Sequence, residues 1–230
     1  MGLEFNALNL MRFAKKQGGS FRRTATLGRQ WGTENAYCEG QIKRDFGAEV
    51  VDSFDNSAYE GATQIVDLGA PFTHQFEPYD TVFDGGTLEH IYNIPQALWN
   101  TSQLCKPGGQ ILHVLPANNL CGHGFYQFSP ELFFSLYSER NGYHDTVVFM
   151  SDFRYVEFWW KAARPANGHR ITRNISGELT AAVVRTVRGE TVSHKDVYQS
   201  DYVHAWNGRG GITEEPEPDD FVKCRVEELI

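Results

Sequence analysis

Residues 79–116 contain the feature that most constrains the fold, which is two short apolar runs separated by a helical stretch. The first run, residues 79–84, stops at Gly85 and Gly86, as a strand does when it ends in a loop. The second run covers residues 110–115. A strand, a helix and a second strand in this order predict a parallel crossover, and in open sheets of such units ligands bind at the carboxyl ends of the strands.

Proline and glycine set the expected limits of these elements. Apolar residues between the two runs recur at helical spacing, and Pro95 is the expected start of the helix. The turn at residues 106–109 should end it, because proline cannot continue a helix and glycine accepts a left-handed cap. Pro116 is expected to end the second strand.

Composition narrows the function classes. The chain has 230 residues, of which 41% are hydrophobic, and this is enough for one good core. The formal net charge is −8 and there is no long basic cluster, so nucleic acid is not an expected partner. The chain predicts neither a membrane segment nor a signal peptide, since no apolar run approaches about 20 residues.

The four cysteines and the two ends of the chain complete this outline. No two cysteines have the spacing of a metal-binding pair, so they fit reduced thiols in a cytoplasmic protein, and no metal site is expected. Residues 1–18 read as an N-terminal helix and its stop. We expect one domain over residues 1–206, followed by an acidic, mobile tail over residues 207–230. The oligomeric state is not readable.

Further strands are predicted on both sides of the central unit. Each is a short apolar run bounded by glycine or polar residues. Ser129 and the proline after it predict the start of another helix, which should end at Asn141 and Gly142. The expected strands cover residues 21–27, 48–53, 63–68, 143–150 and 179–187.

The segments FDGGTLEHI and LCKPGGQILHVLP, one helix apart, resemble the second half of the core of class I S-adenosylmethionine-dependent methyltransferases. The resemblance implies an α/β fold with a Rossmann-like sheet. That sheet should be mostly parallel, with an antiparallel hairpin at one edge and helices on both faces. It also implies S-adenosylmethionine as the cofactor.

The first glycine-rich turn of that family is rewritten here. The segment reads TATLGRQWG, so Thr26 stands where an acid is expected, and only two glycines remain. The sequence resembles a subgroup with an L-G-R-Q turn at this place, often found among polysaccharide or secondary-metabolite functions. We therefore expect a reshaped cofactor site that keeps Gly28 and in which the side chain of Arg29 or Gln30 replaces the usual backbone contacts.

The resemblance assigns the remaining cofactor residues by position. Asp55 is the candidate for the two ribose hydroxyls and Asp52 is its competitor, although acids are also common in ordinary turns. Asp67 and Leu68 inherit the contact with the adenine. The strand end that precedes the LEH segment contributes Asp84, Gly85 and Gly86 on the methionine side.

Two histidines are candidates for the catalytic base. His90 lies where the helical run opens, and His123 lies in the glycine-punctuated loop after the second strand. An imidazole titrates near neutral pH, so either side chain suits proton transfer. His123 is the stronger candidate because its loop should meet the substrate. Each could instead be a structural histidine.

The sequence thus predicts methyl transfer to the oxygen or nitrogen of a small-molecule acceptor, such as a sugar, a glycan precursor or a secondary-metabolite precursor. An alternative is a non-catalytic binding or partner subunit that kept the sheet and lost the cofactor turn. A dinucleotide-dependent enzyme is disfavoured because the sequence has no G-x-G-x-x-G motif.

Overall fold

The computed structural model describes residues 4–175, 177, 179–212 and 220–230. The first half of the chain contains both helices and strands, and three strands follow one another between residues 50 and 84 without a helix between them. The helices are α1 (Phe5–Lys16), α2 (Glu39–Phe46), α3 (Ile94–Leu104), α4 (Pro130–Leu136), α5 (Ser200–Trp206) and α6 (Val226–Leu229), with 3-10 turns η1 (Leu88–His90) and η2 (Glu139–Asn141). The strands are β1 (Arg23–Leu27), β2 (Val50–Asp55), β3 (Gln64–Ile65), β4 (Tyr79–Asp84), β5 (Cys105–Asn118), β6 (Tyr143–Asp152), β7 (Phe158–Ala162), β8 (Thr180–Arg188) and β9 (Phe221–Arg225).

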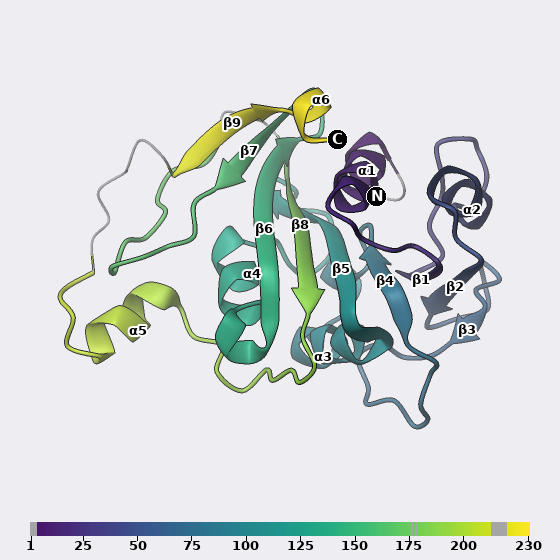
Figure 1. The fold of residues 1–230 in the computed structure, drawn as a ribbon, viewed down its shortest axis with the longest axis horizontal. Coiled ribbons are helices and arrows are strands. Elements are labelled where there is room, and N and C mark those ends of the chain that lie inside the picture. Colours follow the sequence, from purple (N-terminus) through teal and green to yellow (C-terminus); the bar gives the residue numbers. More distant parts are fainter. Residues whose placement is uncertain (1–3, 176, 178, 213–219) are drawn as a thin grey trace.

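These strands form a single sheet in the order β3-β2-β1-β4-β5-β8-β6-β7-β9 (Figure 1). The pairs from β3 to β5 are parallel, and the pairs from β5 to β9 are antiparallel. Strand order reverses at β1, where the chain first runs outward to β2 and β3 and then returns to β4. Such a switch point is where open α/β sheets bind ligands.

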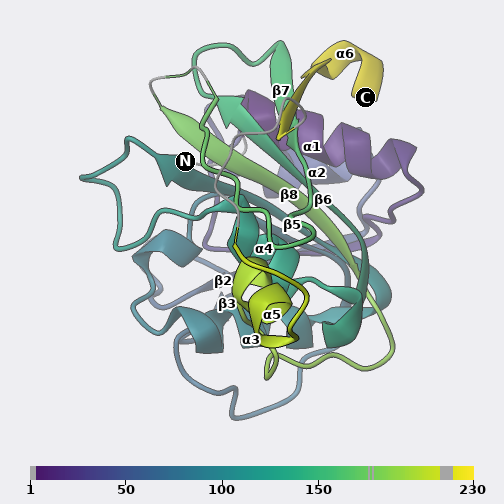
Figure 2. The ribbon, with the colours of Figure 1, turned by 90° about the vertical axis from the view of Figure 1, so that its left-hand side faces the viewer.

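Two hydrophobic cores cover the two faces of the sheet. One core packs α1 and α2 against one face, and the other packs α3 and α4 against the opposite face. Figure 2 shows α1 and α3 on opposite sides of the sheet. Every residue of β4 is buried, as expected for a central strand that is covered on both faces.

The antiparallel half of the sheet is larger than a hairpin. The expected sixth and seventh strands are β6 and β8, but β7 and β9 extend the sheet beyond β6. Residues 221–229, which we expected to lie in a mobile tail, form β9 and α6. β9 pairs with β7, and the Lys223 ammonium lies 4.0 Å from the ring centre of Phe158. The pairing with β7 and this contact hold residues 221–225 in place, although their segment's polar composition had predicted mobility. Residues 213–219 of the expected tail lie outside the described residues.

Proline did not end β5 where the sequence predicted. Pro116 lies inside the strand and is in register with Ala181 of β8. The pairing of β5 with β4 ends at His113, so the last residues of β5 have a neighbour on one side only. A proline lacks the backbone N–H, and an edge position needs no donor on the open side. The turn predicted at residues 106–109 is also part of this strand.

Other element boundaries differ by a few residues. The strand predicted at residues 63–68 is short, since only Gln64 and Ile65 pair with β2. The helix predicted to start at Ser129 does start with Pro130, but the Ser129 side chain makes no capping hydrogen bond. Gly142, with a φ of 84°, provides the expected left-handed stop after η2. Among the described helices, none has the length and apolar character needed to cross a membrane.

His194 fastens the segment after β8 to the sheet. Its Nε2 lies 2.8 Å from the Tyr143 hydroxyl and 3.2 Å from the Ser102 hydroxyl, and its ring meets the edge of Trp99. Burial lowers the pKa of His194 to about 4. The imidazole is therefore neutral in the folded protein at pH values where it becomes charged in the unfolded chain, which has a pKa of about 6.5.

Acidification is therefore expected to cost stability through His194. The unfolded chain binds a proton between pH 6.5 and 4 and the folded protein does not, so stability falls as the pH drops through this window. His194 is partly exposed, so we expect a loss on the order of 1 kcal/mol between pH 7 and pH 5. Urea unfolding at both pH values checks this, with the non-titrating variant His194→Gln as the control. An equal loss in the variant would contradict the assignment.

Candidate active site

The carboxyl ends of β1, β2 and β4 meet at one edge of the sheet. Leu27, the last residue of β1, is in register with Phe54 of β2 and with Asp84 of β4. The residues that follow these strands, Gly28 and Gly85 among them, are therefore neighbours in space. The switch point of the sheet thus brings together the segments that the sequence assigned to the cofactor.

Side-chain hydrogen bonds hold the turn after β1 in place. The Gln30 amide donates to the Leu27 carbonyl at 2.6 Å and to the Thr87 hydroxyl at 3.1 Å. Thr87 donates to the same carbonyl at 2.6 Å. Gly28 has a φ of +70°, and a Cβ at this position would lie 2.6 Å from the Thr87 Oγ1 atom. Glycine is required here on both counts.

Arg29 braces the same turn from the outside. Its guanidinium pairs with Glu39 at 2.8 Å, lies 3.9 Å from the ring centre of Tyr37 and donates to the Glu60 carbonyl. The Asp55 carboxylate lies 3.5 Å from the Arg29 backbone nitrogen. The Arg29 side chain is thus engaged within the protein, and the turn is ordered by side chains where the resemblance implies a glycine-rich loop.

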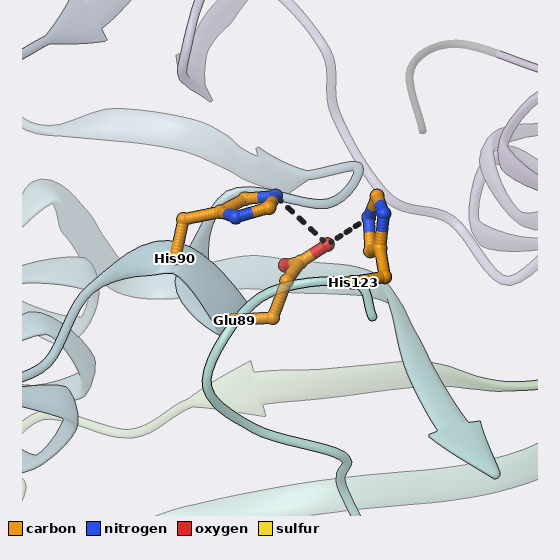
Figure 3. Close-up of side chains that lie close together, drawn as sticks. All are labelled: Glu89, His90 and His123. Carbon is orange, nitrogen blue, oxygen red and sulfur yellow. Dashed lines mark ion pairs between the residues drawn. The ribbon is translucent and has the colours of Figure 1, made fainter. Parts of the chain in front are cut away.

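Glu89, His90 and His123 form a cluster at the same edge of the sheet (Figure 3). The Glu89 Oε1 atom lies 3.2 Å from the His123 Nε2 and 3.8 Å from the His90 Nε2. The Glu89 side chain is fully buried, whereas His90 and His123 are 51% and 37% exposed. Within the described part of the chain, neither Glu89 carboxylate oxygen nor His123 Nε2 has a partner with hydrogen-bond geometry.

Backbone contacts bring the two parts of this cluster together. Glu89 and His90 lie in η1, directly after β4, and His123 lies in the loop after β5. The Phe125 N–H donates to the Glu89 carbonyl at 2.6 Å. A Cβ on Gly124 would lie 2.7 Å from the same carbonyl, so only glycine lets the loop approach this closely.

The environment shifts the proton affinities within the cluster. Burial, and then the nearby charge of Asp84, raise the pKa of Glu89 to about 8. Burial, and then the neighbouring His123, lower the pKa of His90. Such shifts are typical of functional sites, because catalytic groups need pKa values matched to the working pH.

Known structures of the same architecture include methyltransferases. No protein-family model matches the sequence, and no curated protein matches it either. The structure matches a phosphoethanolamine N-methyltransferase 2 of Haemonchus contortus with a TM-score of 0.53 and 15% sequence identity. That structure was solved with phosphomonomethylethanolamine and S-adenosylhomocysteine, and the match covers 80% of this chain and 52% of that enzyme. The chain has the class I methyltransferase fold.

Two more solved structures are similar to this chain. A second structure of the Haemonchus contortus enzyme, in complex with S-adenosyl-L-methionine, matches with a TM-score of 0.51 and 14% identity over 80% of this chain. A SAM-dependent methyltransferase of Thermotoga maritima matches with a TM-score of 0.48 and 13% identity, over 81% of this chain and 90% of that one. The chain spans about half the length of the Haemonchus enzyme.

Within this methyltransferase fold, the predicted cofactor acids occupy three different environments. Asp55 is half-buried at the end of β2, and its carboxylate also accepts the Ser57 N–H at 3.3 Å. Asp67 is exposed and accepts the Gly69 N–H at 2.8 Å. Asp52, the alternative to Asp55, accepts the Tyr79 hydroxyl at 2.9 Å.

Asp84 is fully buried, and both of its oxygens are engaged. One accepts the Thr87 N–H at 2.9 Å, and the other lies 3.1 Å from the His113 Nδ1. The opposite nitrogen of His113 lies 2.7 Å from the Tyr137 hydroxyl.

Leu68, the predicted adenine contact, is also buried, and its carbonyl accepts a hydrogen bond from the Asn100 amide. Gly86 has a φ of 104°, which suits the sharp turn that leads into η1.

Both histidines lie at the sheet edge where the sequence predicted them, but the sequence did not predict that the Glu89 side chain lies between them. Glu89 was not among the predicted site residues, although it is the buried centre of the cluster. The sequence predicted no metal site, whereas the described structure places three ligand-type atoms within 4.8 Å of one another. The missing glycines of the turn after β1 already pointed to Gln30, whereas Thr87, which holds the same Leu27 carbonyl, was not predicted.

Proposed function

We propose that the protein transfers a methyl group from S-adenosylmethionine to an oxygen or nitrogen of a small polar acceptor. The observation that carries this proposal is the shared edge of the methyltransferase fold. Gly28 follows β1 there and Asp55 is the last residue of β2, and the Glu89–His90–His123 cluster follows the next strands of the parallel half. A nucleoside site beside a polar, partly exposed cluster is the arrangement that methyl transfer needs.

A cavity at the start of the loop that carries His123 is the proposed acceptor site; Glu89, His90 and His123 are not among its walls, so the acceptor would have to extend from it toward the cluster. Its volume is about 450 Å³, which suits a small molecule, and Asn118 lines it at the point where the loop that carries His123 begins. The other polar walls include Glu131, Gln199 and an Arg170–Asp201 ion pair with a separation of 2.6 Å. A polar acceptor with hydroxyl or amino groups would find both donors and acceptors there.

The proposed chemistry divides between the cofactor and the chain. S-adenosylmethionine supplies a methyl group on a positively charged sulfur. The chain has to align the acceptor with that carbon and accept the proton that the acceptor loses. We assign the proton to His123, with His90 as the alternative. The pKa of Glu89 is raised to about 8, so the positive charge that forms on His123 would favour loss of the Glu89 proton, and the resulting carboxylate would stabilise the imidazolium.

Calorimetry with S-adenosylmethionine and S-adenosylhomocysteine tests the proposal. We expect saturable binding of both, one per chain. A second candidate function, a non-catalytic subunit with the same fold, is favoured by the turn after β1, where two side chains already occupy the Leu27 carbonyl. An absence of binding at millimolar cofactor would support that second function and contradict the first.

The ribose contact gives a sharper prediction. Asp55→Ala is expected to weaken binding of S-adenosylhomocysteine by about tenfold or more, because two hydroxyl hydrogen bonds to a carboxylate would be lost. Calorimetry measures the change. Asp52→Ala is the matched control, because its carboxylate is already bonded to Tyr79 and it should bind within about twofold of the wild type. An unchanged dissociation constant in Asp55→Ala would remove this residue from the cofactor site.

A further inference from the structure

We propose that the Glu89 carboxylate and the imidazoles of His90 and His123 form a binding site for one divalent transition-metal ion. The three ligand-type atoms lie within 4.8 Å of one another (Figure 3). Two imidazoles and one carboxylate suit zinc, iron, cobalt or manganese better than magnesium or calcium, which prefer oxygen ligands.

One of the two carboxylate–imidazole distances already matches that of ligands that share one ion, and the other is slightly longer. Atoms that coordinate a zinc ion at about 2.1 Å lie roughly 3.0–3.5 Å from one another. The Glu89 Oε1 atom is 3.2 Å from the His123 Nε2 and 3.8 Å from the His90 Nε2. Small side-chain rotations would bring all three atoms within bonding distance of an ion.

Burial of Glu89 is the second, independent observation. The carboxylate is fully buried, and neither oxygen has a hydrogen-bond partner among the described residues. Burying such a group without a partner is costly, and native structures rarely leave one unsatisfied. The ion pairs of the described residues join Glu89 to His90 and His123 only. A cation held between the three side chains would supply the missing partner.

Rigid backbone and open access are both present. The Phe125 N–H bond to the Glu89 carbonyl, and the close approach of Gly124, fix the loop of His123 against η1. His90 and His123 are each partly exposed, so an ion would keep coordination positions that face outward. The site is therefore built like a catalytic centre with room for an exogenous ligand.

The consequence for catalysis rests on the proposed methyl transfer, whereas metal binding itself does not. An ion at this site would take a hydroxyl oxygen of the acceptor as a ligand and lower its pKa, so that the proton would pass to solvent water; the oxygen would then form a bond to the methyl carbon as the carbon–sulfur bond of the cofactor breaks. The His123 Nε2 has one lone pair, so it serves either as a metal ligand or as the base. Metal binding would thus move the activation of the acceptor from His123 to the ion.

The test is a titration of the full chain, without a histidine tag and stripped by chelator, with Zn²⁺ by calorimetry and with Co²⁺ by visible absorption. We expect one ion per chain in the wild type. His90→Ala and His123→Ala should each weaken Zn²⁺ binding at least tenfold, and Glu89→Gln should do so as well. His144→Ala is the control, because this histidine is exposed on β6 and pairs with its neighbour Asp145.

Several outcomes would overturn the site. These are an absence of binding at millimolar Zn²⁺, or equal affinity in wild type and His90→Ala, which points to adventitious ligands elsewhere. Glu89→Gln could unfold the protein, but His90 is half exposed, so the His90→Ala variant keeps the test decisive. S-adenosylhomocysteine binding, measured in the same chelator-stripped samples, separates the two proposals. Cofactor binding without metal binding refutes only the metal site, and metal binding without cofactor binding refutes only the methyl transfer.

Discussion

His123→Ala is expected to lower the turnover number about 10²–10⁴-fold, the range typical for loss of a positioned base, while binding of S-adenosylhomocysteine stays within about twofold. The physical reason is position. His123 lies in the loop after β5, its Nε2 is next to a buried carboxylate, and it is partly open to an incoming acceptor. The measurement is release of S-adenosylhomocysteine with an acceptor that the wild type turns over, found by screening hydroxylated and amino compounds.

Two comparisons decide how His123 acts. His90→Ala should reduce turnover much less if His123 is the base, and more than His123→Ala if the roles are reversed. If both histidines are metal ligands, the two variants should lose activity together, and added metal should raise wild-type activity only. His144→Ala, remote on β6, should be unaffected. Full activity in His123→Ala would exclude it from both roles.

The sequence predicted β4 and its neighbourhood well because the strongest local signals coincide there. A buried central strand reads as a continuous apolar run, and the Gly85-Gly86 pair marks its end. Prediction failed where an element depends on distant neighbours. Pro116 stays in a strand because β5 continues beyond the end of β4 and pairs there with β8 alone. Residues 221–225 form β9 because the outer edge of β7 is open to pairing. No local pattern carries that information.

The candidate site shows the same division. The sequence could place His90 and His123 at one sheet edge, because His90 follows β4, His123 follows β5, and these two strands are parallel neighbours. It could not predict that Glu89 would lie between them, since that depends on the Phe125 N–H bond to the Glu89 carbonyl. Nor could it tell which acid at a strand end is exposed to solvent. Asp84 and Asp67 both follow a short apolar run in the sequence, yet Asp84 is fully buried and Asp67 is exposed.

Asp84→Ala is expected to destabilise the protein by about 3 kcal/mol or more. The substitution leaves the half-buried Thr87 N–H and the fully buried His113 Nδ1 without their acceptor, and each unsatisfied buried group costs about 1–3 kcal/mol. Loss of the Thr87 contact also loosens the turn after β1, since the Thr87 hydroxyl holds the Leu27 carbonyl. Urea unfolding measures the free energy directly.

Asp67→Ala is the matched control for the stability loss that we expect in Asp84→Ala. Asp67 is exposed, and its contact in the structure is a local bond to the Gly69 N–H, so the variant should lose less than about 1 kcal/mol. If Asp67 holds the adenine, the same variant should instead weaken binding of S-adenosylhomocysteine. A stable Asp84→Ala variant with weakened cofactor binding would reverse these assignments and place Asp84 against the cofactor. Asp84 is enclosed by Thr87 and His113, so we expect the stability of the edge to depend on Asp84 and ligand affinity on the open acids, Asp55 and Asp67.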